Sequence, residues 1–158
     1  AAEGPMMASR SVDALRHGAD GTVGHVRSGG VGWVGFITIG SIYYLIPRLW
    51  GKKEMYSIKL IEAHFWIATI GVVLYIASMW ISGVMQGLMW GALNDDGTLT
   101  YSFVESVKQS MPFYMIRFAG GVLYLTGMIL MAYNVYRTVS GGKAVDAEIP
   151  VISQTQHH

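Results

Sequence analysis

Long apolar stretches separated by short polar segments make up most of the chain. Three stretches carry no Asp, Glu, Lys or Arg: 20 residues over 28–47, 32 residues over 63–94 and 19 residues over 118–136. A bilayer needs about 20 apolar residues per helical crossing, and unsatisfied backbone groups in lipid force such stretches into helices. The pattern therefore predicts three transmembrane helices. We place them at 22–47, 57–93 and 102–139.

Turn-forming residues agree with these limits. Pro47 is expected to end the first helix, the run 94–97 (Asn-Asp-Asp-Gly) to turn the chain before the third, and the Gly pair at 141–142 to stop the third. The fold class is therefore all-α, an integral membrane helical bundle.

We divide the chain into a membrane domain and a tail. The domain covers residues 1–148, in which 1–21 are a helix end and an outer loop. Residues 149–158 are polar and are expected to form a flexible tail. Because the chain opens without a basic n-region or an initiator Met, we expect it to be a piece of a larger chain.

Composition supports a membrane protein. Hydrophobic residues make up 52% and charged residues 13%, against about 25% charged in soluble domains. This excludes intrinsic disorder. A net charge of +1 without a basic stripe argues against nucleic acid as a partner. The absence of Cys excludes disulfides, thiolate metal sites and a Cys nucleophile. The expected partner is the lipid bilayer.

Loop charges indicate an orientation. The connection 48–59 carries four basic residues, whereas the connection 94–101 carries Asp95 and Asp96 and no base. The positive-inside rule therefore places the first connection and the C-terminus in the cytoplasm. Arg10 and Arg16 before the first helix, and Arg27 near its start, would then lie outside, which opposes this orientation.

Histidine is the residue type here that can ligate a metal at membrane depth. His25 is flanked by glycines, which would let a flat porphyrin approach the backbone, so it is a candidate metal or haem ligand. The alternative is a histidine at headgroup level that bonds to water. His64 is interpreted as structural, near the cytoplasmic end of the second helix, where it can reach the headgroups. His157 and His158 are interpreted as an accident or a tag remnant.

Two charged residues have open interpretations. Glu3 is either surface-exposed or a proton-relay acid, and the residues alone favour the surface. Arg117 either reaches toward the outer interface with its charged end or binds a carboxylate of a bound cofactor.

Several motifs together resemble a known family. They are EGPMM at 3–7, GHV at 24–26, GWVGF at 32–36, YYLIPRLW at 43–50, HFW at 64–66 and SGVMQG at 82–87. In this order they resemble the C-terminal part of the catalytic subunit I of cbb3-type cytochrome c oxidases, over about residues 3–150. The resemblance implies the last three helices of a twelve-helix haem–copper oxidase subunit in the bacterial inner membrane.

The resemblance also implies a function and partners. The family reduces oxygen to water with electrons from membrane-anchored c-type cytochrome subunits and pumps protons. Its cofactors are high-spin haem b, low-spin haem b and copper. The copper ligands lie upstream of this chain, so this piece alone is not competent and needs the rest of subunit I.

Site residues follow by position. His25 matches the axial ligand of the high-spin haem b. The second histidine of the family pattern, an axial ligand of the low-spin haem, is replaced here by Arg27, which has no lone pair for iron. Gly18 and Gly21 stand where the family usually has Tyr and Trp.

The resemblance also implies that three further positions lie near the cofactors and that Glu3 lies near the oxygen site. Glu3 matches a glutamate near the oxygen site on the proton-uptake route, which reverses the surface interpretation. His17 and Asp20 fall in the outer loop near the haem propionates, and Arg117 is placed to assist them.

Three interpretations follow. The first is the C-terminal part of a working oxidase subunit. The second is a non-catalytic or impaired homologue that lacks low-spin haem because of Arg27. The third is an unrelated three-helix membrane protein in which His25 is incidental.

Overall fold

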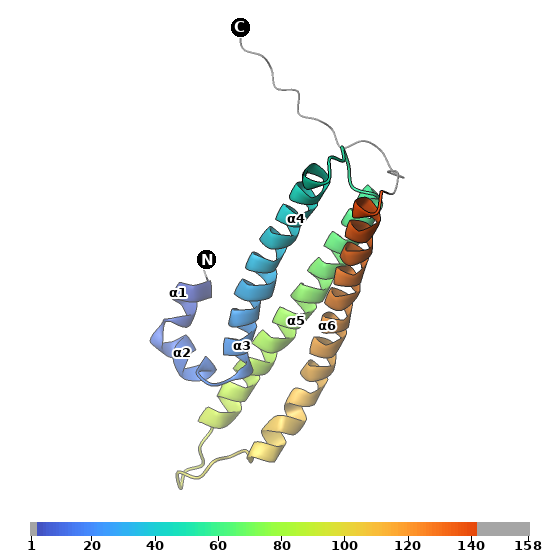
Figure 1. Ribbon diagram of the computed structural model, residues 1–158. Helices are drawn as coiled ribbons and strands as arrows, with labels where there is room; N and C mark the ends of the chain where they lie inside the picture. The colour runs from blue at the N-terminus through green and yellow to red at the C-terminus, as the bar shows by residue number, and fades with distance from the viewer. Residues whose placement is uncertain (1–2, 142–158) are drawn as a thin grey trace.

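Three long helices lie side by side in the computed structural model, which describes residues 3–141 (Figure 1). The first runs without a break over Asp20–Leu49 and consists of α3 (Asp20–Arg27), the π-helix η1 (Ser28–Val34) and α4 (Gly35–Leu49). The others are α5 (Ile58–Gly91) and α6 (Phe103–Val139). All three are long and apolar enough to span a membrane, as predicted.

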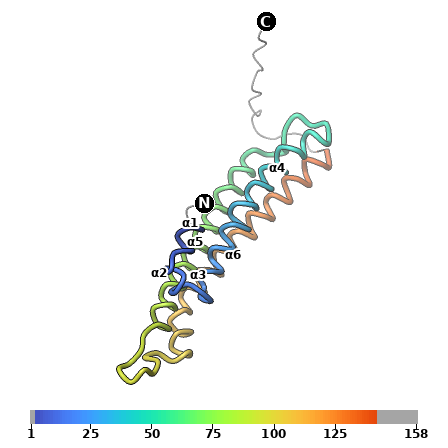
Figure 2. Tube along the Cα trace, turned by 90° about the vertical axis from the view of Figure 1, so that its left-hand side faces the viewer, coloured from blue at the N-terminus to red at the C-terminus, as the bar shows by residue number. Residues whose placement is uncertain are grey.

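These helices exceed one bilayer crossing. They have 30, 34 and 37 residues, which at 1.5 Å per residue is about 45–55 Å against a hydrocarbon core of about 30 Å. Such helices tilt or project from the bilayer. The bundle is long and narrow, with the N-terminal segment folded beside one half of it (Figure 2).

Two glycines let α5 and α6 approach closely. A Cβ atom added to Gly71 would lie 2.7 Å from the carbonyl oxygen of Gly120, and one added to Gly120 would lie 2.6 Å from the carbonyl oxygen of Gly71. Small residues at a crossing are what membrane helices use to pack without a hydrophobic driving force. This contact fixes how closely α6 lies along α5.

Polar side chains join α5 to α6 at the end next to the basic connection. The buried amide of Asn134 accepts from the backbone N–H of Ser57 at 3.0 Å and donates to its carbonyl at 2.8 Å. Ser57 in turn caps α5 by accepting from the N–H of Leu60. Backbone groups at the start of α5 are thus satisfied by the neighbouring helix.

The opposite end turns where the sequence predicts. The N–H of Gly97, which has a φ of +80°, donates to the carbonyl of Asn94 at 2.9 Å. Thr98 donates to Asp96 through both its hydroxyl and its N–H, and these bonds lower the pKa of that carboxyl. The turn therefore keeps its negative charge. Ser102 and Glu105 then form a capping box that begins α6.

The N-terminal segment differs from the predicted loop. Residues 1–21 were expected to be a helix end and a loop, but the structure has α1 (Glu3–Met7) and α2 (Arg10–Arg16) there, and α3 begins at Asp20. A helix of seven residues carries too few apolar positions to show a period, which is why the pattern missed α2.

Proline and glycine mark two further boundaries. Pro47 lies inside α4, which continues to Leu49, so the helix outlasts its proline by two residues. Gly141 follows the end of α6 with a φ of +84°, which agrees with the predicted stop. The proposed tail 149–158, with His157 and His158, lies outside the described residues.

Orientation gives a first testable prediction. Because the chain has no Cys, Lys53→Cys and Asp96→Cys each introduce a unique thiol in it. We expect a membrane-impermeant maleimide applied from the periplasmic side to label position 96 and not position 53, owing to the charge difference between the loops. Labelling of position 53 alone would reverse the assigned orientation.

Candidate functional site

The corner between α2 and α3 rests directly on the backbone of α5. A Cβ atom added to Gly83 would lie 2.1 Å from the backbone nitrogen of Gly21, and one added to Gly87 would lie 1.8 Å from the carbonyl oxygen of Leu15. Backbone atoms cannot move aside as side chains can, so this contact requires glycine at both positions. It sets where α3 begins.

This contact gives a second prediction. Gly87→Ala should push α2 away from α5 and destabilise the assembled protein by about 1–3 kcal/mol, the usual cost of overpacking. Gly91→Ala is a matched control on the same helix, because a Cβ atom there has no neighbour within 4 Å. Thermal unfolding of the purified complex measures both. Equal melting temperatures for the two variants would contradict the contact.

A hydrogen-bonded clamp holds the first residue of α3. The side-chain oxygen of Gln86 accepts from the N–H of Asp20 at 3.0 Å, and its amide nitrogen donates to the Asp20 carboxylate at 3.0 Å. The hydroxyl of Ser82 donates to the same carboxylate oxygen at 2.8 Å. Gln86 also donates toward Ser110 and Tyr114 of α6. The start of α3 is thereby tied to both long helices.

Sequence reasoning missed Gln86. A signal was present, because an amide inside a 32-residue stretch without charges must find partners at membrane depth. The sequence did not say which residues those partners would be. They lie up to 66 positions away, at Asp20.

One turn and a half along α3, His25 meets Glu3. The imidazole Nδ1 lies 3.2 Å from Oε2 of Glu3, within ion-pair distance, although its angle does not make a good hydrogen bond. The hydroxyl of Ser28 lies 3.0 Å from the same carboxylate oxygen. Glu3 is 16% exposed and its Oε1 is buried without a partner. The surface interpretation of Glu3 is thus wrong for this fold.

Open space surrounds His25. A cavity of about 770 Å³ lies there, with Glu3, His25 and Ser28 in its wall. Its glycines leave room, since a Cβ atom added at Gly29 would have no neighbour within 4 Å. A flat ligand can therefore approach the helix next to the imidazole.

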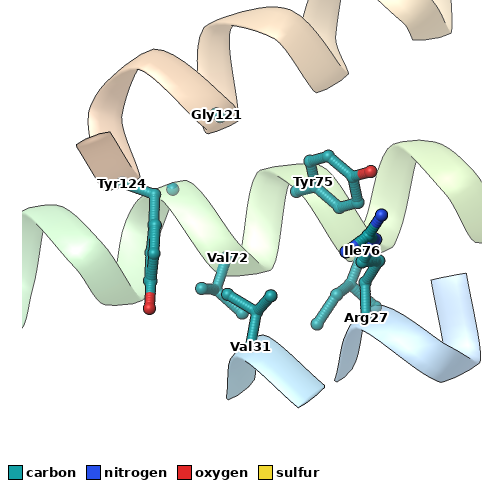
Figure 3. Close-up of a pocket in the computed structure, with 9 residues that line it drawn as sticks. Arg27, Val31, Val72, Tyr75, Ile76, Gly121 and Tyr124 are labelled. Carbon is teal, nitrogen blue, oxygen red and sulfur yellow. The ribbon is translucent and has the colours of Figure 1, made fainter. Parts of the chain in front are cut away.

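Arg27 faces a separate cavity of about 230 Å³ between η1, α5 and α6. Figure 3 shows its side chain reaching toward Tyr75 and Ile76, with Tyr124 at the other end. The residues that line this cavity include no carboxylate. Asp20 is bonded to α5 instead and forms no ion pair with Arg27 in the described part of the chain.

The remaining predicted site residues lie apart from His25. His17 is 87% exposed and lies 3.5 Å from the carboxylate of Asp13. The side chain of Arg117 meets α5, where it lies 3.4 Å from the sulfur of Met79 and near the ring of Tyr75. It also lies near the ring of Tyr114 on its own helix, α6.

His64 corrects another expectation. It is 2% exposed and does not reach the headgroups. Its Nδ1 shares a hydrogen bond of 2.6 Å with the hydroxyl of Tyr43, and its ring fills the space beside Gly127, where an added Cβ atom would lie 2.9 Å from Cδ2. This tight packing favours the structural interpretation of His64.

The two unusual glycines before His25 have structural reasons, a backbone conformation at Gly18 and a close side chain at Gly21. Gly18 has a φ of +78°, a conformation that other residues rarely adopt. Gly21 makes room for Arg16, because an added Cβ atom would lie 2.6 Å from Nε of that side chain. Arg16 is 5% exposed and lies 5.8 Å from the ring centre of Trp80. The side chain of Arg16 therefore occupies the space that a side chain at position 21 would need.

Comparison with known proteins identifies the class. The model of the family "Cytochrome C and Quinol oxidase polypeptide I" matches residues 1–123. The chain therefore belongs to this family, which comprises the subunit I proteins of haem–copper oxidases.

Individual members of the family show how similar this chain is to each of them. The chain is 56% identical to the cbb3-type cytochrome c oxidase subunit CcoN1 of Stutzerimonas stutzeri, over 91% of this chain and 30% of that protein. It is 52% identical to the bacteroid cytochrome c oxidase subunit 1 homolog of Bradyrhizobium diazoefficiens, over 96% and 28%. A nitric oxide reductase subunit of Stutzerimonas stutzeri is 29% identical over 78% and 26%. The chain thus spans less than a third of the length of these relatives.

The family implies haem and copper as cofactors. The residues at positions 25 and 27 differ in whether they can bind a haem iron. At His25 the residues fit a haem iron, because the other ring nitrogen of a ligating imidazole faces a carboxylate, a backbone carbonyl or water, and Glu3 lies 3.2 Å from it here. At Arg27 they do not fit an iron ligand, because guanidinium has five donors and no acceptor. Among residues 3–141, no three His, Asp or Glu side chains come together as a metal site.

Proposed function

We propose that this chain forms the C-terminal helices of the catalytic subunit of a terminal respiratory oxidase of cbb3 type. The complete subunit would reduce oxygen to water with electrons from membrane-anchored c-type cytochromes and would pump protons. It would lie in the bacterial inner membrane. The names and identities of the relatives support this assignment.

One observation carries the proposal within this chain. The carboxylate of Glu3 lies 3.2 Å from the Nδ1 of His25, beside a cavity with room for a flat ligand. A high-spin haem b bound there would supply the iron to which oxygen binds. His25 would hold that iron through its other ring nitrogen, and Glu3 would orient the ring and fix its tautomer.

Glu3 also suits a role in proton delivery. Its Oε1 is buried and unpartnered while its Oε2 contacts His25 and Ser28. A buried carboxyl group with a free oxygen can take up and release a proton at that atom. Asp20, His17 and Arg117 are proposed to lie around the haem propionates, and copper would be held by residues outside this chain.

An optical spectrum of the complete subunit with its partners tests the proposal. The reduced-minus-oxidised difference spectrum, recorded with and without carbon monoxide, should contain a haem b signal that responds to carbon monoxide. A complex without any such signal would refute the assignment to a terminal oxidase.

A second candidate function rests on Arg27. We propose that the protein lacks a bis-histidine low-spin haem and is an impaired homologue. The support is chemical, since Arg27 stands where the family has a histidine ligand and lines an apolar cavity that holds no carboxylate. The same spectrum tests this second candidate, because a bis-histidine low-spin signal should be absent from the protein that carries Arg27.

A further inference from the structure

The helix that carries His25 has no capping side chain of its own. Ala19 stands at the N-cap position of α3, and its side chain accepts no hydrogen bond from the backbone. The first N–H groups of a helix have no partner inside it. The N–H of Asp20 donates instead to the side-chain oxygen of Gln86 at 3.0 Å. A residue of α5, 66 positions away in the chain, therefore caps α3.

Gln86 also holds Asp20 at a second point. Its amide nitrogen donates to the Asp20 carboxylate at 3.0 Å, and the hydroxyl of Ser82 donates to the same oxygen at 2.8 Å. Gln86 and Ser82 are both buried. Hydrogen bonds depend on direction and are stronger where the dielectric constant is low. Two bonds from one side chain to one residue thus fix where α3 begins and how it is rotated about its axis.

The close packing around this corner does not fix that rotation by itself. Gly83 and Gly87 let the backbone of residues 15–21 approach α5, but the van der Waals attraction between packed atoms has no preferred direction. Further along the first long helix, η1 buries none of its residues within the described chain. The directional bonds between Asp20 and α5 are therefore what orients α3.

His25 follows Asp20 by five residues on the same helix. Five residues correspond to about 1.4 turns and a rise of about 7.5 Å, so a rotation or shift of α3 at Asp20 also moves the imidazole. Groups at a functional site must be held within about 0.5 Å and about 10–20° of their working geometry. The bonds at the start of α3 are close enough to His25 to supply this precision.

We propose that Gln86 is a positioning residue for His25, because it caps α3 from α5 and, through Asp20, fixes the orientation in which the imidazole meets the haem iron. This inference rests on the proposed role of His25 as an iron ligand. Gln86 acts through the helix and touches neither the imidazole nor the haem.

Gln86→Met tests this role, because methionine has a similar size and makes none of these hydrogen bonds. A misaligned imidazole forms a weaker bond to iron. In the reduced complete complex, we therefore expect the iron–histidine stretching frequency in resonance Raman spectra to fall. The rate of oxygen reduction should fall about tenfold to 100-fold, the range that small misplacements cause.

Two matched variants separate positioning from general damage. Ser78→Ala is the control on α5, since the buried hydroxyl of Ser78 donates to the carbonyl of Tyr75 at 2.8 Å and not to Asp20, and it should keep the wild-type frequency. The double variant Asp20→Asn, Gln86→Glu exchanges the carboxylate and the amide at constant net charge. The new carboxylate can accept from the backbone N–H of residue 20 and from the new amide, so the frequency should return to the wild-type value.

Each outcome decides the proposal. An assembled Gln86→Met complex whose stretching frequency does not fall overturns it, as does a double variant that stays as strongly shifted as Gln86→Met. If Gln86→Met does not assemble, Gln86→Asn replaces it, because its amide is one methylene shorter and cannot reach both atoms of Asp20. A fall in frequency in that variant supports the proposal, and an unchanged frequency overturns it. Failure of the proposed function is recognised separately, because the carbon monoxide-reactive haem would then survive His25→Ala.

Discussion

His25→Ala should abolish the carbon monoxide-reactive haem signal of the complete subunit. Alanine has no lone pair for iron, and neither of the other described histidines lines the cavity, since His17 is paired with Asp13 and His64 with Tyr43. The loss should exceed the about 10–100-fold drop in metal affinity that follows removal of a ligand's outer partner. The carbon monoxide difference spectrum of the purified complex measures it.

A matched variant makes this result specific. Ser41→Ala removes a hydroxyl that donates to the carbonyl of Ile37 and does not line the cavity, so its signal should stay at the wild-type level. Assembly of both variants is checked by the recovery of the intact complex. An assembled His25→Ala complex with an unchanged signal would remove His25 from the oxygen site.

Arg27→His should create a bis-histidine low-spin haem signal that the Arg27 protein lacks. Imidazole binds iron through a nitrogen lone pair, whereas guanidinium has no acceptor atom and stays protonated below a pKa of about 12. Electron entry to the oxygen site should accelerate together with the new signal. The measurement is the low-temperature spectrum and the rate of haem reduction by a c-type cytochrome.

Arg27→Gln is the control for charge. It removes the cation without supplying an iron ligand, so it should not produce the low-spin signal. A complete bis-histidine spectrum in the protein that carries Arg27 would show that this motif is wrongly matched to the family, and the assignment of His25 would fall with it.

Much of the fold could be predicted from the chain because the bilayer restricts the choices. Long uncharged stretches must be helices in lipid, and the turn at 94–97 formed where Asn, Asp and Gly cluster. The short helix α2 could not be predicted, because seven residues carry no readable period. Its place on α5 depends on Gly87, whose role appears only when Leu15 is packed against it.

Part of the candidate site could also be predicted from the sequence, and part could not. His25 and Arg27 could be singled out from the sequence by residue type, since the lone pair of an imidazole and its absence from guanidinium are properties of single side chains. The groups that contact His25 could not be predicted from the sequence. Glu3 and Ser28 meet at His25 because the N-terminal segment folds back beside α3.

The sequence by itself thus determined the three spans, the turns between them and the candidate ligand, because each depends on local composition and on the solvent. Only the tertiary structure decided that Gln86 clamps Asp20, that Arg16 fills the space beside Gly21, and that Glu3 lies next to His25. These contacts join distant parts of the chain, and the close approach of helices through glycine determines which side chains meet.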